Sequence, residues 1–218
     1  MEYKAEVAIV GGGILGLAHA YAAAKRGRRV VLFERSPRAA GASVRNFGMI
    51  WPVGQPHGEM HETAMRSREI WAEVLRDAQL PHFLTGSLHV VYRDDEAAVA
   101  QEFARLAPAL GYECQWLDAR GVLERSHAVR SEQLLGGLWS RTELTVDPHV
   151  TIAALPTFLS ERYGVQFRFT AAVRSIDLPR IEAGAEQWKT DCAIVCGGDD
   201  FENVVSRTPR RCGTHSSV

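Results

Sequence analysis

The 218-residue sequence lacks an excess of charge of either sign, with 25 basic and 26 acidic residues. This balance gives no reason to expect nucleic acid or an anionic membrane as a partner. No apolar run is long enough to span a bilayer. The short apolar run at 7–10 ends in glycines, which is typical of a buried strand and not of a signal peptide. Four cysteines are too few to suggest a disulfide framework, so we expect a cytoplasmic protein.

Several motifs that carry chemistry are also missing. No G-x-S-x-G sequence is present, which leaves a hydrolase triad without support. His57 and His61 are four residues apart, but no third ligand follows them, so we expect no metal site. Cys192 and Cys196 lie in an alternating segment, and we interpret them as small buried residues of a strand.

The first 34 residues contain the most informative pattern. An apolar strand runs into a loop with glycines at 11, 13 and 16, and a helical segment and a second apolar strand ending at Glu34 follow. In a dinucleotide-binding unit, Gly11 permits the tight turn, Gly13 lets the backbone approach a pyrophosphate, and Gly16 lets the helix pack closely on the strand. The helix N-terminus attracts phosphate, and Glu34 accepts hydrogen bonds from a ribose.

Later segments predict further elements. Apolar spacing predicts a helix over 58–78 and a second helix, which Asp94 or Asp95 caps at its N-terminus. The second helix has an apolar stripe at Val99, Phe103, Leu106 and Leu110. Asp147-Pro148 predicts the start of a helix that ends before Gly164. The apolar segment 193–198 is typical of a strand in the middle of a parallel sheet.

The order of these elements resembles the D-amino-acid oxidase and glycine oxidase superfamily of FAD-dependent oxidoreductases. The similarity covers residues 3–201 and depends on the glycine loop with Glu34, the segment 41–49, the helix after Asp147 and the strand at 193–198. It implies an α/β fold: a Rossmann-like FAD-binding domain with an inserted, incomplete α+β substrate domain. The expected divisions are 1–80 and 147–203 for the FAD-binding domain, 81–146 for the partial substrate domain, and 204–218 for a disordered or aberrant tail. Family members continue further, so we expect that the chain is truncated at its C-terminal end.

The resemblance also implies a set of FAD-contacting residues. By similarity, the backbone after Gly13 meets the pyrophosphate, Glu34 and Arg35 the adenosine, and Val173 the adenine edge. The segment from Ala42 to Met49 passes beside the phosphates, the ribityl chain and the flavin ring. The implied cofactor-binding residues are Gly11, Gly13, Ile14, Leu15, Gly16, Glu34, Arg35, Ala42, Ser43, Arg45, Asn46, Phe47, Gly48, Met49 and Val173.

The activity that the resemblance implies is oxidation of the C–N bond of a small amine or amino acid, by hydride transfer to flavin N5. Oxygen or another acceptor would reoxidise the flavin, and no catalytic side chain is identified. The segment 45–52 is similar to a branch associated with aminoalkylphosphonate oxidation. In that case Arg45 would suit phosphonate or flavin phosphate oxygens; a structural ion pair is an equally good interpretation.

Two other functions are open. An NAD-dependent dehydrogenase would use the same opening unit, but a second nucleotide-binding half is hard to find. The chain could instead be a truncated fragment that binds a dinucleotide without catalysing a reaction.

Overall fold

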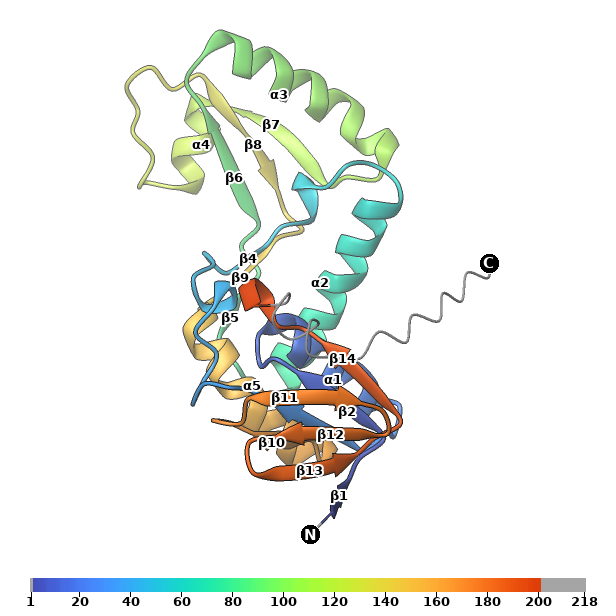
Figure 1. Ribbon diagram of the computed structural model, residues 1–218. Coiled ribbons are helices and arrows are strands. Elements are labelled where there is room, and N and C mark those ends of the chain that lie inside the picture. The colour runs from blue at the N-terminus through green and yellow to red at the C-terminus, as the bar shows by residue number, and fades with distance from the viewer. Residues whose placement is uncertain (1, 201–218) are drawn as a thin grey trace. The chain divides into compact units, whose positions relative to one another are not determined.

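The computed structural model describes residues 2–200 as a mixed α/β structure (Figure 1). The chain forms two compact units. Unit 1 is Met1–Asn46 with Pro148–Val218, and unit 2 is Phe47–Asp147, which lies between the two parts of unit 1 in the sequence. The sequence-based division placed residues 47–80 with the FAD-binding domain, whereas the structure groups them with the inserted unit. The predicted tail at 204–218 lies outside the described residues.

Unit 1 is built around a four-stranded parallel sheet. Its order is β10 (Gln166–Arg168), β3 (Val30–Phe33), β2 (Val7–Val10) and β14 (Cys192–Val195). β2 and β3 are runs of Val, Ala, Ile, Leu and Phe, and every residue of β3 is buried. Such continuous apolar strands are expected where both faces of a parallel sheet are covered.

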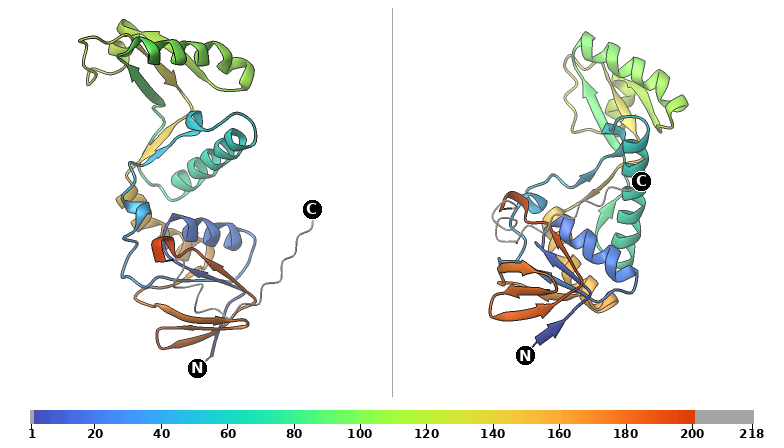
Figure 2. Two further views of the ribbon diagram at one scale, coloured as in Figure 1. Left: turned by 45° about the horizontal axis from the view of Figure 1, so that its top comes forward. Right: turned by 45° about the vertical axis from the view of Figure 1, so that its right-hand side comes forward.

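An antiparallel sheet covers one face of this parallel sheet, and two helices cover the other (Figure 2). The antiparallel sheet contains β11 (Val173–Asp177), β12 (Arg180–Ala183) and β13 (Glu186–Lys189), and β1 (Glu2–Lys4) pairs with β13 in parallel. The buried cluster between the sheets consists of Ala5, Ala8, Val10, Val31, Phe33, Val173, Ile176, Ile181, Ala183 and Trp188. Unit 1 therefore has three layers.

The two helices on the other face are α1 (Ile14–Lys25) and α5 (Pro148–Tyr163), which pack against each other. The predicted bounds of α5 are confirmed: it begins at Pro148 and ends before Gly164, which has a φ of +70°. Pro at the first helical position and Gly just past the end both fit helix geometry. Pro156 lies inside α5 and removes one backbone donor without ending the helix.

Unit 2 contains two three-stranded antiparallel sheets. The first has the order β4 (Met49–Ile50), β9 (Leu144–Val146), β5 (His82–Phe83), and α2 (Glu59–Asp77) packs on it through Leu75. The second is formed by β6 (Ser87–Val91), β8 (Gly136–Ser140) and β7 (Cys114–Asp118). α3 (Asp94–Leu106) and α4 (Ala119–Arg125) flank this second sheet.

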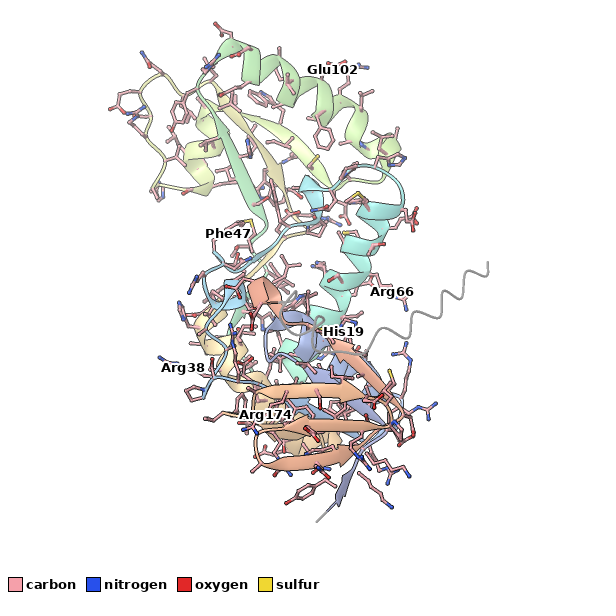
Figure 3. All side chains as sticks on the ribbon, in the orientation of Figure 1. His19, Arg38, Phe47, Arg66, Glu102 and Arg174 are labelled. Atoms are coloured by element: carbon pink, nitrogen blue, oxygen red, sulfur yellow. The ribbon has the colours of Figure 1, made fainter. Side chains whose placement is uncertain are left out.

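Phe47 is the first residue of unit 2, and its side chain is 73% exposed (Figure 3).

A buried carboxylate connects three segments of unit 2. Glu143 is fully buried, and it accepts hydrogen bonds from Val53 N (3.1 Å), Thr142 Oγ1 (2.7 Å) and Ser87 Oγ (3.1 Å). These donors come from the short helix η2 (Pro52–Gly54), the turn before β9 and the start of β6. A buried charge needs such donors, because its removal from water is otherwise costly.

Several local predictions were wrong. Arg93, not an aspartate, occupies the N-cap of α3, and Val99 of the predicted apolar stripe is 69% exposed. Among the described residues, β14 is an edge strand of the parallel sheet and not a middle strand. Cys192, interpreted as buried, is exposed. These predictions relied on local sequence patterns, whereas burial, capping and the place of a strand in its sheet depend on residues from elsewhere in the chain.

Between residues 2 and 200, no helix combines the length and the apolar character needed to cross a membrane.

Glu6, just before β2, ties the start of that strand to the segment before β3. Its carboxylate accepts hydrogen bonds from the backbone N–H of Arg29 (3.0 Å) and from Nη1 of Arg28 (3.0 Å). These two bonds, in that order of importance, lower the pKa of Glu6 from 4.5 to about 2. Ionised Glu6 therefore stabilises the fold above its unfolded-state pKa, and this contribution is lost as the pH falls through about 2.

Glu6→Gln keeps an acceptor oxygen but removes the charge. We expect the variant to be less stable than wild type at neutral pH, and the two proteins to converge as the pH falls from 4.5 towards 2. Urea unfolding midpoints across this range measure the effect. Glu161→Gln, on the exposed surface of α5, is the control and should track wild type throughout. A constant difference between Glu6→Gln and wild type at every pH would contradict the assignment.

Candidate functional site

The glycine loop follows β2 directly and turns sharply at Gly11. Gly11 has a φ of +112°, and its N–H donates to the carbonyl of Phe33 at 2.8 Å. A Cβ at this position would lie 2.3 Å from the carbonyl oxygen of Cys196. Both the backbone conformation and the close approach exclude a side chain here.

Gly16 sets the distance between α1 and the strand. A Cβ on Gly16 would lie 1.9 Å from the carbonyl oxygen of Gly11 and 3.4 Å from a methyl group of Ile9. Because the side chain is absent, the first turn of α1 lies directly against the end of β2. This is the role that the sequence predicted for the third glycine.

The N-terminus of α1 has no acidic residue in its first turn and no side-chain cap from its N-cap residue, Gly13. Instead Ile14 N–H donates to the hydroxyl of Ser43 at 2.9 Å. Ser43 lies in the short helix η1 (Ala42–Val44), and its Oγ would be 3.1 Å from a Cβ on Gly13. The structure thus brings together the predicted site residues Gly13, Ile14 and Ser43. The first-turn N–H groups of a helix favour an oxygen acceptor or an anion at this position.

Glu34 connects the glycine loop to the end of β3. One carboxylate oxygen accepts from Gly12 N at 2.8 Å and the other from Ser36 N at 2.8 Å. The carboxylate was predicted to bind a ribose, and each of its oxygens keeps further acceptor capacity for a hydroxyl donor. The two backbone bonds fix where that acceptor lies.

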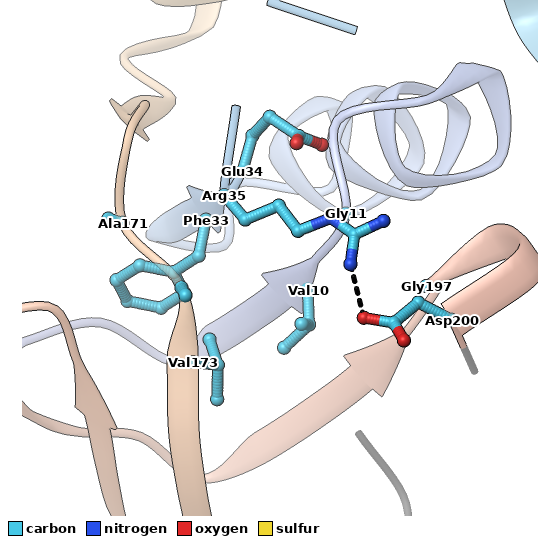
Figure 4. Close-up of a pocket in the computed structure, with 10 residues that line it drawn as sticks. Val10, Gly11, Phe33, Glu34, Arg35, Ala171, Val173, Gly197 and Asp200 are labelled. Atoms are coloured by element: carbon cyan, nitrogen blue, oxygen red, sulfur yellow. Dashed lines mark hydrogen bonds and ion pairs between the residues drawn. The ribbon is translucent and has the colours of Figure 1, made fainter. Parts of the chain in front are cut away.

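A cavity of about 400 Å³ opens beside these residues (Figure 4). Its floor is formed by the ends of β2 and β3, and Ala171 closes one wall by donating its N–H to the carbonyl of Glu34 at 2.9 Å. Arg35 extends along the cavity and forms an ion pair with Asp200. The lining residues are Val10, Gly11, Phe33, Glu34, Arg35, Ala171, Ala172, Val173, Gly197 and Asp200.

Four predicted site residues, Gly11, Glu34, Arg35 and Val173, therefore line one cavity. Leu15, on the first turn of α1, is 66% exposed. The remaining predicted residues lie in η1 or follow it, and their roles stay predictions. Ala42, Arg45 and Asn46 are exposed in unit 1, whereas Phe47, Gly48 and Met49 begin unit 2, where β4 pairs with β9.

Sequence reasoning missed Asp200, Ser36 and the wall residues Ala171 and Ala172. Asp200 lies in the short helix η4 (Gly198–Asp200), soon after the glycines that end β14. An acid that follows an apolar strand and glycines was an available signal, because ligands of open α/β sheets bind beyond the carboxyl ends of the strands.

The two histidines weighed as metal ligands have other contacts. His57 Nδ1 is 3.1 Å from the carbonyl oxygen of Leu110, and the buried ring of His61 contacts the ring of Tyr112 in a tilted arrangement, with 4.1 Å between centroids. In the part of the chain that the structure describes, no group of three or more His, Cys, Asp and Glu is arranged to hold a metal ion.

The residues present fit a dinucleotide. The loop offers backbone where side chains are sterically excluded, the N–H groups of the helix N-terminus donate to an oxygen, and a carboxylate and a guanidinium line the adjacent cavity. These features define a dinucleotide-binding protein of the α/β class. Comparison with protein families is more specific: the DAO family, described as FAD dependent oxidoreductase, matches residues 6–211. The chain belongs to this family, whose cofactor, FAD, is the one predicted from the sequence.

Individual relatives agree with this assignment. The chain is 28% identical over 147 residues to glycine oxidase from Geobacillus kaustophilus, covering 64% of this chain and 39% of that protein. It is 39% identical over 74 residues to D-amino-acid oxidase from Streptomyces coelicolor, covering 34% of this chain and 23% of that protein. The structure is similar to L-proline dehydrogenase from P. horikoshii, with a TM-score of 0.83, 20% identity, and coverage of 95% of this chain and 56% of that one.

The structural likeness confirms the expected α/β fold class. The chain spans less than two thirds of the length of each of these three proteins.

Gly16→Ala tests the contact between α1 and β2. Alanine favours a helix by about 1 kcal/mol over glycine, yet we expect a net loss of about 1–3 kcal/mol, because the Cβ would overlap the Gly11 carbonyl. Urea unfolding measures this loss. Gly41→Ala is the matched control, since no atom lies within 4 Å of its Cβ position. Equal stability of the two variants would contradict the close packing.

Ser43→Ala tests the cap that η1 supplies to α1. We expect a loss of about 1 kcal/mol, the usual value for removal of a hydroxyl cap, and faster hydrogen exchange at Ile14. Ser43→Thr keeps the hydroxyl and should restore protection of that amide. Unchanged exchange at Ile14 in Ser43→Ala would show that the hydroxyl does not cap the helix in solution.

Proposed function

We propose that this chain binds FAD and belongs to an oxidoreductase that oxidises the C–N bond of a small amine or amino acid. The observation that carries the proposal is the glycine loop with its adjoining cavity: Gly11, Glu34 and Arg35 meet at the ends of two parallel strands. Because the chain covers 39% of its glycine oxidase relative, FAD binding is proposed for this chain and the activity for the whole protein.

In this proposal each part of unit 1 has a defined role. Gly13 exposes backbone to the pyrophosphate, and the N-terminal turn of α1, including Ile14 and Leu15, provides N–H groups to its oxygens. The Ser43 hydroxyl, which now accepts from Ile14, rotates to donate to a phosphate oxygen. Glu34 accepts from the ribose, and Val173 contacts the adenine edge. Bound FAD would supply the hydride acceptor, and the protein positions it.

The proposed substrate class follows the names of the relatives, glycine oxidase, D-amino-acid oxidase and L-proline dehydrogenase, which are all named for amino acids. Within that class we propose an aminoalkylphosphonate as a narrower candidate, supported by the segment 45–52. Arg45 is exposed and has a guanidinium suited to phosphonate oxygens. Oxygen or another acceptor would reoxidise the cofactor, in a cytoplasmic setting consistent with unpaired cysteines such as Cys114.

NAD-dependent dehydrogenation is the second candidate, because the opening unit of Rossmann-like proteins binds either dinucleotide. The match of the FAD-dependent family over residues 6–211 favours FAD.

The visible absorption spectrum of the purified, desalted chain tests the proposal. We expect oxidised flavin bands at close to one flavin per chain after incubation with FAD.

Gly13→Val should abolish flavin retention, because its branched side chain would occupy the place where the backbone meets the pyrophosphate. Ala18→Val, at an exposed position of α1, adds similar bulk and should retain flavin. A colourless wild type that binds NAD would contradict the cofactor assignment, and equal flavin content in Gly13→Val would contradict the site.

A further inference from the structure

One cationic side chain, Arg35, and two carboxylates, Glu34 and Asp200, line the cavity. Arg35 directly follows Glu34, and its Nη1 forms an ion pair with Asp200. Its Nη2 is 3.9 Å from Asp199, a side chain that is 94% exposed. Figure 4 shows the guanidinium of Arg35 directed towards Asp200, away from the carboxylate of Glu34. The only cationic side chain that lines the cavity, among the described residues, is thus already paired.

This pairing matters for which adenosine the cavity accepts. In dinucleotide-binding folds, an acid at the end of the second strand accepts from the ribose 2′-hydroxyl, whereas a nearby arginine accommodates a 2′-phosphate. Both side chains are present here as neighbours. The sequence at Glu34-Arg35 alone is therefore compatible with either ligand, and the partner of Arg35 decides between them.

Asp200 is the residue that pairs with Arg35 and so affects which ligand Arg35 can bind. A guanidinium held by a carboxylate cannot at the same time offer its paired edge to a phosphate. Glu34, Asp199 and Asp200 also add three negative charges around one positive charge, which disfavours a dianionic group. In this pair the side chain of Asp200 is 26% exposed and that of Arg35 is 56% exposed, so solvent screens the ion pair only in part.

We propose that Asp200 is a specificity-determining residue: by holding Arg35, it makes the cavity accept an unphosphorylated adenosine ribose and reject a 2′-phosphorylated one. The proposal rests on the proposed dinucleotide function and goes beyond it, since it assigns a role to a residue 165 positions from Arg35 in the sequence. Neutral ribose hydroxyls bind Glu34 without disturbing the ion pair.

The test compares two ligands that differ by a single phosphate, ADP-ribose and 2′-phospho-ADP-ribose. Their dissociation constants are measured by calorimetry on the full chain. Wild type should prefer ADP-ribose by at least tenfold. Asp200→Asn should improve binding of 2′-phospho-ADP-ribose on the order of tenfold, about the value of one charge-assisted hydrogen bond, and change ADP-ribose affinity less than twofold. The double variant Asp199→Asn/Asp200→Asn removes the second carboxylate and should increase the gain.

Two further variants separate specific release of Arg35 from a general change in charge. Asp177→Asn, at the exposed end of β11, removes the same charge elsewhere in unit 1 and should leave both affinities unchanged. Arg35→Gln in the Asp200→Asn background should abolish the gain in 2′-phosphate binding. Thermal unfolding of each variant confirms that the fold is intact.

The outcomes distinguish this inference from the proposed function. If wild type binds ADP-ribose but Asp200→Asn leaves the ratio of the two affinities unchanged, the role of Asp200 is wrong and the dinucleotide site stands. If Asp200→Asn strengthens both ligands equally, the effect is general electrostatics and the inference is also overturned. If neither ligand binds wild type or any variant, the dinucleotide function itself fails, and the inference fails with it.

Discussion

The contact between Gly16 and the carbonyl of Gly11 is the constraint on which the site depends. A Cβ at Gly16 would be 1.9 Å from that oxygen, so α1 can begin this close to β2 only with glycine there. The close approach directs the N-terminus of α1 towards the loop and brings Ile14 within reach of Ser43. Glu34 and Arg35 line the cavity beside this loop, where β2 and β3 end.

Carboxylates that accept backbone N–H groups are a second recurring feature. Glu6 binds the N–H of Arg29, Glu34 binds that of Gly12, and Asp118 caps α4 through Gly121 N at 2.8 Å. In unit 2, the buried carboxylate of Glu143 holds Val53. An ionised acceptor strengthens such a bond, and it orders loops that lack regular hydrogen bonding of their own. Glu34 orders the glycine loop in this way, and in the proposed function it also accepts from a ribose.

The accuracy of prediction from sequence followed the range of the interactions involved. α2 and α5 were predicted within a residue or two, because helical spacing, proline and glycine act locally. The glycine loop was predicted for the same reason, since its strand, turn and helix are continuous in sequence. The burial of Val99 and Cys192 was predicted wrongly, because spacing shows which residues share a face and not whether anything covers that face. The inserted unit begins at Phe47, earlier than predicted, since α2 packs on strands that lie on both sides of it in the sequence.

The sequence by itself determined the strand–loop–helix–strand unit, because this unit depends on residue types at fixed short spacing, and the resemblance of several segments along the chain indicated the family and its FAD cofactor. Only the tertiary structure decided which distant residues meet. Ser43 reaches Ile14 across 29 positions, and Asp200 reaches Arg35 across 165. Such pairs form when β14 takes its place beside β2 and η1 packs on α5, and no local periodicity encodes either event. The glycine spacing was enough to predict the loop, whereas the pairing of Arg35 with Asp200 depends on the folded sheet, in which β14 lies beside β2.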